Sequence, residues 1–154
     1  MTQHLRLQLF GGFQLLSGTT AITGVNTQRL QSLLAYLVLH RQAPQSRQQL
    51  AFLFWPDSNE QQARTNLRNA LFQLRNQLTD PDLLLQVESQ TLQWRADAPL
   101  GLDVADFEEA LAIAQTAKEP AAVQQALQQA VNLYVGELLP GHYDEWLLPL
   151  REQL

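Results

Sequence analysis

The chain has 154 residues, of which 45% are hydrophobic, and it carries a formal net charge of −5 with no cysteine. This length and composition fit one globular domain or two small ones. The absence of cysteine excludes disulfides, thiolate zinc sites and cysteine nucleophiles. The longest apolar run, residues 33–39, is far shorter than a membrane span, and the first residues lack the apolar core of a signal peptide. We therefore expect a soluble, cytoplasmic protein with no membrane partner.

The charge is unevenly distributed along the chain. Residues 1–98 hold eight basic and six acidic residues, a net charge of +2, whereas residues 99–154 hold two basic and nine acidic residues, a net charge of −7. Such asymmetry indicates nucleic-acid contact by the more basic half. Strand-like patterning also ends near Pro99 and helical patterning begins there. The sequence thus predicts two domains, 1–98 and 99–154.

The first half begins with strands and continues with helices. Leu5, Leu7 and Leu9 alternate with polar residues, which predicts a half-buried strand. Further short strands are expected at residues 13–16 and around residues 21–22. Apolar periodicity then predicts a helix over residues 27–41. Ser46, three residues before Gln49, predicts the N-cap of a short helix over residues 47–54.

A longer helix and a hairpin complete this half. Residues 57–59 offer N-caps for a helix over residues 59–78, which the Asp80-Pro81 pair stops. Residues 83–87 and 91–94 then flank a polar turn and predict a hairpin over residues 83–95, although its turn contains neither Gly nor Asn. Strands, three helices and a terminal hairpin follow one another in a winged helix-turn-helix.

The second half is predicted to be helical, over residues 103–117, 120–135 and 143–154. Gly136 follows the second of these helices, as is usual after a helix end, and Pro149 is expected to kink or restart the third. Three short helices make a thin core by themselves. We therefore expect them to pack on the strands at the start of the chain, near Phe10 and Phe13. The predicted fold class is an α+β winged helix-turn-helix followed by an all-α helical segment.

The helix over residues 59–78 carries the candidate DNA-reading surface. Its leucines cluster on one face, and no acidic residue follows Glu60 within it. Arginine can bind guanine or phosphate, and asparagine and glutamine match adenine. An ordinary solvated face is the alternative, but such faces usually mix charges of both signs. The residues of this helix that we expect to read DNA are Gln61, Arg64, Thr65, Arg68, Asn69, Phe72 and Arg75, with Asn76 beside them.

Residues outside this helix extend the candidate site. Gln90 and Thr91 at the hairpin turn and Arg95 beyond it are expected to touch phosphates or the minor groove. An equal alternative is that Arg95 only ends a strand. Arg47 lies in the first turn of its helix and is expected to contact the DNA backbone. Trp55, in the loop before the reading helix, fits a core plug better than a partner anchor.

No catalytic or metal site is expected. The three histidines are far apart, and phosphate-binding, dinucleotide-binding and nucleophile-elbow motifs do not occur. His142, Asp144 and Glu145 are close in sequence, but such residues entering a helix more often cap it than bind a metal. We therefore predict a protein that is not an enzyme and has no cofactor.

Several motifs together resemble a known family. LQLFGGF at residues 7–13, LLAYL at residues 33–37 and LFWPD at residues 53–57 resemble the DNA-binding domain of antibiotic-regulatory-type bacterial transcription activators. The pairs Ala63-Arg64, Leu67-Arg68 and Leu74-Arg75 continue this resemblance through the reading helix. Residues 102–107, LYVGELLPG at residues 133–141, Trp146-Leu147 and Arg151 resemble the bacterial transcriptional activator domain that follows it.

The resemblance implies a response-regulator-type winged helix joined to a tetratricopeptide-like helical domain. It also implies binding to promoter direct repeats, a homodimer on DNA and contact with RNA polymerase, for which Trp55, Pro56 and Asp57 are the candidates. Since stacked helical repeats need neighbours, we expect the chain to be a fragment of a longer regulator.

The predicted function is sequence-specific binding of double-stranded DNA by a transcription regulator, with activation favoured over repression. Helix 59–78 would lie in the major groove and hairpin 83–95 would be the wing. The alternative is a protein–protein interaction module whose winged helix does not bind DNA. The salt dependence of duplex binding separates the two.

Overall fold

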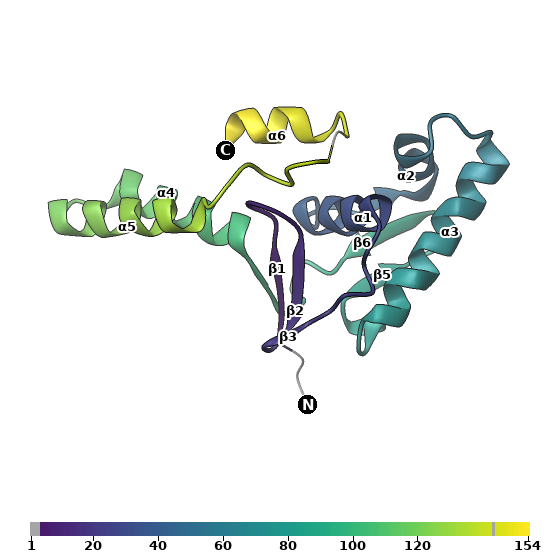
Figure 1. Cartoon of the computed structure of the whole chain (residues 1–154), viewed down its shortest axis with the longest axis horizontal. Helices are drawn as coiled ribbons and strands as arrows, with labels where there is room; N and C mark the ends of the chain where they lie inside the picture. The colour runs from purple at the N-terminus through teal and green to yellow at the C-terminus, as the bar shows by residue number, and fades with distance from the viewer. Residues whose placement is uncertain (1–3, 143) are drawn as a thin grey trace. The chain divides into compact units, whose positions relative to one another are not determined.

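The chain folds into two compact units of mixed α/β structure, in a computed structural model that describes residues 4–142 and 144–154 (Figure 1). Unit 2 comprises Ile22–Pro99 and is inserted within unit 1, which comprises the residues up to Ala21 and those from Leu100 onward. Each unit is described by itself below.

Unit 2 contains three α-helices and a small antiparallel sheet. The helices are α1 (Gln28–Leu39), α2 (Arg47–Phe54) and α3 (Glu60–Gln77). The sheet has the order β4-β6-β5, built from β4 (Gln45–Ser46), β6 (Thr91–Trp94) and β5 (Leu85–Val87). The strand β4 was not expected, because two residues carry no period-two pattern and only pairing with β6 defines them. The hairpin begins at Leu85 rather than at residue 83, since a 3₁₀ turn, η1 (Pro81–Leu83), precedes it.

Each helix of unit 2 begins at a polar cap of the expected kind. The side-chain oxygens of Thr27, Ser46 and Asn59 accept hydrogen bonds from the amides of Leu30, Gln49 and Gln62, at 3.2, 3.2 and 2.8 Å. These bonds satisfy backbone donors that have no partner inside the helix. The helix starts are therefore set locally, and the predicted N-cap at Ser46 is confirmed.

The apolar faces of α1 and α3 are buried as their periodicity predicts. Leu30, Leu33, Leu34 and Leu37 of α1 are buried, and so are Ala63, Leu67, Ala70, Leu71 and Leu74 of α3. Trp94, at the end of β6, adds a fully buried ring. Full burial of a leucine side chain contributes roughly 1.5–3 kcal/mol, so the apolar face determines which side of α3 points outward.

The hairpin turn forms without glycine or asparagine. Val87 pairs with Leu92, and the Glu88 amide donates to the Thr91 carbonyl at 2.9 Å. Among the described residues other than glycine, only Asp80 and Leu139 have a positive φ. The turn over residues 88–91 therefore uses conformations open to any residue, which is why it needs no Gly or Asn.

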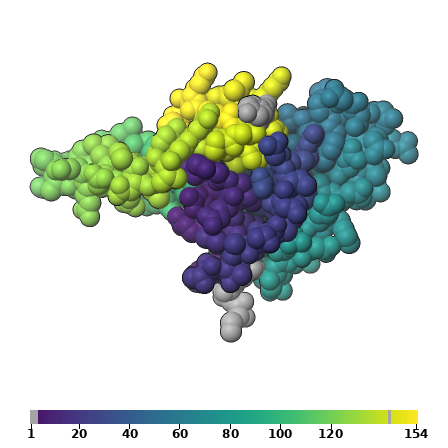
Figure 2. All heavy atoms as spheres, viewed as in Figure 1, coloured from purple at the N-terminus to yellow at the C-terminus, as the bar shows by residue number. Residues whose placement is uncertain are grey.

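Over residues 4–21, 100–142 and 144–154, unit 1 combines a four-stranded sheet with three α-helices. The sheet has the order β3-β2-β1-β7, from β3 (Thr20–Ala21), β2 (Gln14–Ser17), β1 (Leu5–Gln8) and β7 (Leu100–Leu102). Strand β7 was not expected, and it pairs with β1 in parallel. The helices are α4 (Asp103–Thr116), α5 (Pro120–Leu133) and α6 (Leu147–Gln153). Helices α4 and α5 form a helical hairpin that extends from the sheet as a narrow arm (Figures 1 and 2).

This grouping places the first strands with the helices, whereas the sequence divided the chain linearly at residue 98. The reason is the pairing of β1 with β7, which joins the two ends of the chain in one sheet. That residues 1–98 together form the DNA-binding domain stays a prediction.

A buried carboxylate, that of Asp103, connects the end of β1 to the start of α4. Its side chain is only 3% exposed, and its oxygens accept hydrogen bonds from the amides of Leu9 and Phe10 at 2.9–3.0 Å. It also accepts from its neighbour Val104 at 2.9 Å. Burial raises the pKa of the Asp103 carboxyl, while these amides and the Arg6 charge act in the opposite direction.

Phe10 provides the apolar platform that we expected for the helical segment. Its ring lies 5.3 Å from that of Phe107 in α4 and 5.0 Å from that of Tyr134, measured between centroids. Phe107 and Tyr134 are 5.7 Å apart, so the three rings form one cluster. Phe13, which was also expected near this platform, is only half-buried.

The segment from the end of α5 to the start of α6 differs from two predictions, which concerned Gly136 and Pro149. Gly136 has no positive φ. A Cβ atom there would lie 2.8 Å from the Gly11 Cα, so close backbone approach requires this glycine. Helix α6 begins at Leu147, after the expected start at residue 143, which lies outside the described residues. Pro149 therefore falls in the first turn, where its missing N–H costs no helical hydrogen bond, and no kink is needed.

Arg151 of α6 holds this loop. Its guanidinium donates to the carbonyls of Leu138, Leu139 and His142 at 2.8, 2.6 and 2.6 Å. The sequence marked Arg151 only through its resemblance to the activator domain. Its local sequence carries no sign of this role, because the three acceptors are backbone atoms 9–13 residues away.

Candidate nucleic-acid interface

Helix α3 turns a polar and basic face away from its buried residues. We call this the outward face of α3, and it consists of the polar and basic residues Gln61, Thr65, Arg68, Asn69 and Asn76 together with the aromatic Phe72. All of them are exposed except Thr65, which is half-buried. Glu60 is the helix's only acidic residue and lies in the first turn, where it is favourable at a helix N-terminus. The structure therefore brings together on one surface the residues that the periodicity grouped.

The three arginines of α3 differ in their partners. Arg64 forms an ion pair with Glu60 at 2.7 Å, and Arg75 forms one with Asp82 at 2.7 Å. Arg68 forms no ion pair with any residue that the structure describes. Exposed pairs of this kind contribute about 0–1 kcal/mol each, so they compete only weakly with phosphate. Arg68 is the arginine of α3 whose guanidinium is open to a ligand.

The turn of the hairpin lies against the start of α2. The Arg47 guanidinium donates to the Glu88 carbonyl at 3.0 Å, and the Arg47 amide donates to the Gln90 carbonyl at 2.9 Å. Ser46 pairs with Thr91 across β4 and β6. Three of the predicted site residues, Arg47, Gln90 and Thr91, are thus close together.

Arg95 lies with Arg75 rather than with this group. Its Nε atom donates to the Asp82 carbonyl oxygen at 2.9 Å, while Arg75 binds the Asp82 carboxylate. Two arginines therefore converge on one residue of η1, between the end of α3 and the hairpin. This geometry favours the structural alternative for Arg95, that of ending a strand.

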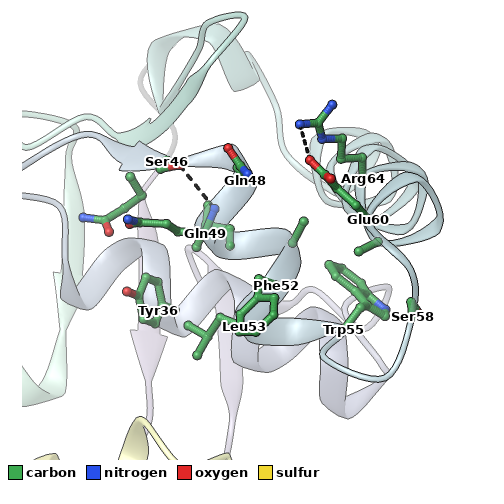
Figure 3. A pocket seen from close by; sticks show the side chains of 14 residues that line it. Tyr36, Ser46, Gln48, Gln49, Phe52, Leu53, Trp55, Ser58, Glu60 and Arg64 are labelled. Atoms are coloured by element: carbon green, nitrogen blue, oxygen red, sulfur yellow. Dashed lines mark hydrogen bonds and ion pairs between the residues drawn. The ribbon is translucent and has the colours of Figure 1, made fainter.

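A groove runs between α2 and the start of α3 (Figure 3). Its volume is about 820 Å³, and its lining includes Phe52, Leu53, Trp55 and Arg64. Phe52 is 73% exposed and Leu53 is 38% exposed. Phe52 is not among the site residues predicted from the sequence. It lies on the side of α2 opposite the buried residues Leu50, Ala51 and Phe54. Helical periodicity in the sequence could therefore have predicted that Phe52 is exposed.

Trp55, beside this groove, is half-buried. The Arg29 guanidinium lies 5.5 Å from its ring centroid, a cation–π contact, and the Phe54 ring lies 6.3 Å away. Pro56 and Asp57, which follow it, are exposed. One side of Trp55 therefore packs against neighbouring residues while the other remains accessible. Its burial is intermediate between that expected of a core residue and that expected of a partner anchor.

Two findings concern other kinds of site. Within residues 4–142 and 144–154, no three His, Cys, Asp or Glu side chains are grouped as a metal site would need. In the same part of the chain, no helix has both the length and the apolar character required to cross a bilayer.

The fold belongs to a class of mixed α/β structure with six α-helices and two small sheets within the described residues. A particular protein with this fold is EmbR from Mycobacterium tuberculosis, solved in complex with a low-affinity phosphopeptide. The TM-score is 0.82 and the sequence identity 20%, over 98% of this chain and 41% of that EmbR chain. The two proteins therefore share a fold, and this chain spans less than half of EmbR's length. No family model and no curated protein matches the sequence.

Proposed function

We propose that this chain belongs to a transcription regulator and binds double-stranded DNA sequence-specifically through a winged helix-turn-helix. Helices α2 and α3 would form the helix-turn-helix, with α3 in the major groove, and β5 and β6 would form the wing. The observation that carries the proposal is the outward face of α3, which presents arginine, asparagine, glutamine and threonine with no acidic residue beyond the first turn. The fold shared with EmbR, a regulator of the antibiotic-regulatory type, supports the same role.

The finer parts of the proposal come from the family resemblance. They are binding to promoter direct repeats as a homodimer, activation through contact with RNA polymerase, and a tetratricopeptide-like character for the α4–α5 hairpin. Trp55, Pro56 and Asp57 are the proposed polymerase contact, since Pro56 and Asp57 are exposed in the loop before α3. The proposed role is non-enzymatic, needs no cofactor and is located in the cytoplasm.

The test is selection of bound sequences from a random duplex library, followed by titration at several salt concentrations. A DNA-binding chain enriches a sequence motif, and its affinity falls steeply as salt rises, because each phosphate contact releases a counterion. Failure to enrich any motif, or an affinity that is independent of salt, would contradict DNA reading.

Arg68→Ala provides the matched variant. It should weaken binding to the selected operator by about 1–3 kcal/mol if Arg68 reads a base. The free energy of unfolding should hardly change, because Arg68 is exposed. Lys118→Ala removes the same charge from the exposed loop between α4 and α5 and serves as the control. Equal affinities of Arg68→Ala and the parent chain would remove Arg68 from the site.

A second candidate function is protein–protein interaction without DNA binding. The exposed Phe52 and Leu53 in the groove beside Trp55 favour it, since accessible apolar side chains next to a cavity are typical of partner sites. Under this alternative, no duplex is selected, and Phe52→Ser reduces partner capture while Arg68→Ala does not.

A further inference from the structure

Phe72 is an exposed aromatic residue at the centre of the outward face of α3. Its side chain is 67% exposed, although the helix buries its other large apolar residues, Leu67, Leu71 and Leu74. At 100° per residue, Phe72 lies on the side of the helix opposite to those leucines. The ring therefore contributes little to the core of unit 2.

Polar side chains surround this ring on the helix surface. Arg68 and Asn69 precede it by one helical turn, and Asn76 follows it by one turn. Side chains at these spacings are neighbours, about 5–6 Å apart at Cβ. Thr65, two turns earlier, donates its hydroxyl to the Gln61 carbonyl at 3.0 Å. The centre of the face thus offers an apolar group between two hydrogen-bonding groups.

The major groove presents one apolar group at the edges of the bases, the 5-methyl group of thymine. A phenyl ring has no hydrogen-bonding atom, so it cannot distinguish the donors and acceptors of the other bases. It can cover a methyl group and remove it from water. Given the proposed placement of α3 in the major groove, we propose that Phe72 reads a thymine through its 5-methyl group and thereby determines specificity at that position.

The neighbours of Phe72 predict the context of this thymine. At 1.5 Å per residue, Arg68 lies about 6 Å and Asn69 about 4.5 Å from Phe72 along the helix axis, which is between one and two base-pair steps of about 3.4 Å. Arginine matches guanine and asparagine matches adenine. The selected operator should therefore contain a thymine with a guanine or an adenine within about two base pairs.

The experiment uses operators selected by the full chain and replaces their thymines one at a time with deoxyuridine. This change removes only the methyl group and keeps every hydrogen-bonding atom. At one position in each half-site, the parent chain should bind the uridine duplex about fourfold more weakly, the effect of one methyl group taken out of water. Phe72→Ala should bind the thymine and uridine duplexes equally, and Phe72→Leu should keep part of the difference.

Gln73→Ala is the matched control, since Gln73 is the exposed neighbour of Phe72 outside the outward face and should keep the full difference. If Phe72→Ala fails to fold, as judged by circular dichroism, Phe72→Gln carries the same expectation. A selected, salt-sensitive operator without any uridine effect would overturn this inference alone, as would a variant that lacks the ring yet keeps the discrimination. If no operator is selected, the proposed function fails and the inference fails with it.

Discussion

At the scale of single residues, the buried carboxylate of Asp103 is expected to contribute strongly to stability. Its carboxylate accepts the amides of Leu9 and Phe10, which are otherwise buried donors at the end of β1. Asp103→Ala should lower the free energy of unfolding by about 2–4 kcal/mol, because each orphaned buried donor costs about 1–3 kcal/mol. Urea denaturation measures this change. Asp106→Ala, which removes an exposed carboxylate 3.5 Å from Arg6, should cost far less, and equal costs would contradict the role of Asp103.

The same residue predicts a pH dependence. Burial raises the pKa of the Asp103 carboxyl in the folded chain, so the folded state holds this proton more tightly than the unfolded state. Its contribution to stability is therefore fully present below the unfolded pKa of about 3.9 and is lost as pH rises through the folded pKa. The free energy of unfolding of the parent, relative to Asp103→Asn, should fall over that window. A difference that is flat or rises with pH would show that the amide hydrogen bonds outweigh burial.

Asp57 permits a separate test of the proposed polymerase contact. It is exposed in the loop between α2 and α3 and lies outside the outward face of α3. Asp57→Ala should leave operator affinity unchanged while reducing transcription activation in vitro. Gln42→Ala, another exposed loop position of unit 2, is the control. Normal activation by the Asp57 variant would contradict the polymerase contact and indicate that the loop has only a structural role.

At the scale of elements, the loop after α5 depends on close contact between two backbones. The Gly11 amide donates to the Glu137 carbonyl at 2.9 Å, and Phe10 forms a β-bridge with Leu138. Gly136→Ala would place a Cβ 2.8 Å from the Gly11 Cα, where neither backbone can easily move. We expect a loss of about 1–3 kcal/mol in the free energy of unfolding, as for other overpacked sites.

Gly101→Ala in β7 is the matched control for this prediction. The nearest atom to its new Cβ would be the end of the flexible Arg6 side chain, at 3.0 Å. That side chain can shift at little cost, so this variant should unfold close to the parent in urea. If both glycine variants are equally stable, the close approach at Gly136 does not constrain the loop.

At the scale of the whole molecule, the insertion of unit 2 within unit 1 determines the expected unfolding behaviour. Unit 2 begins after β3 and ends before β7, which belong to the same sheet of unit 1. Loss of that sheet releases both ends of the insertion, so the chain should unfold in one cooperative transition.

Phe107→Ala tests this cooperativity. The ring is buried and contacts Phe10 and Tyr134, so its removal should cost roughly 3–5 kcal/mol across the single transition. Ile113→Ala, which alters an exposed side chain of the same helix, should cost much less. Calorimetry that resolves two transitions, with only one of them moved by Phe107→Ala, would show that the units unfold independently.

Features of this protein that depend on near neighbours could be predicted from its amino-acid sequence. The caps at Ser46 and Asn59 and the apolar periodicity of α1 and α3 act over a few residues, so they predicted the helices of unit 2 and the outward face of α3. Arg68 and Phe72 were placed on that face for the same reason. A helix buries its apolar side whatever it packs against, and the opposite side must then face outward.

Features whose interaction partners are distant in sequence could not be predicted and depend on the three-dimensional fold. Strands β4 and β7 are too short for a pattern and exist through pairing with β6 and β1. The Asp103 carboxylate meets amides 93 and 94 residues away, and Gly136 is required by the backbone at Gly11. Arg75 and Arg95 converge on Asp82, although one was predicted on the α3 surface and the other after the hairpin. Hydrogen bonds and steric contacts between such residues form only where the fold brings distant parts of the chain together. The spacing of residues within a short segment does not predict these contacts.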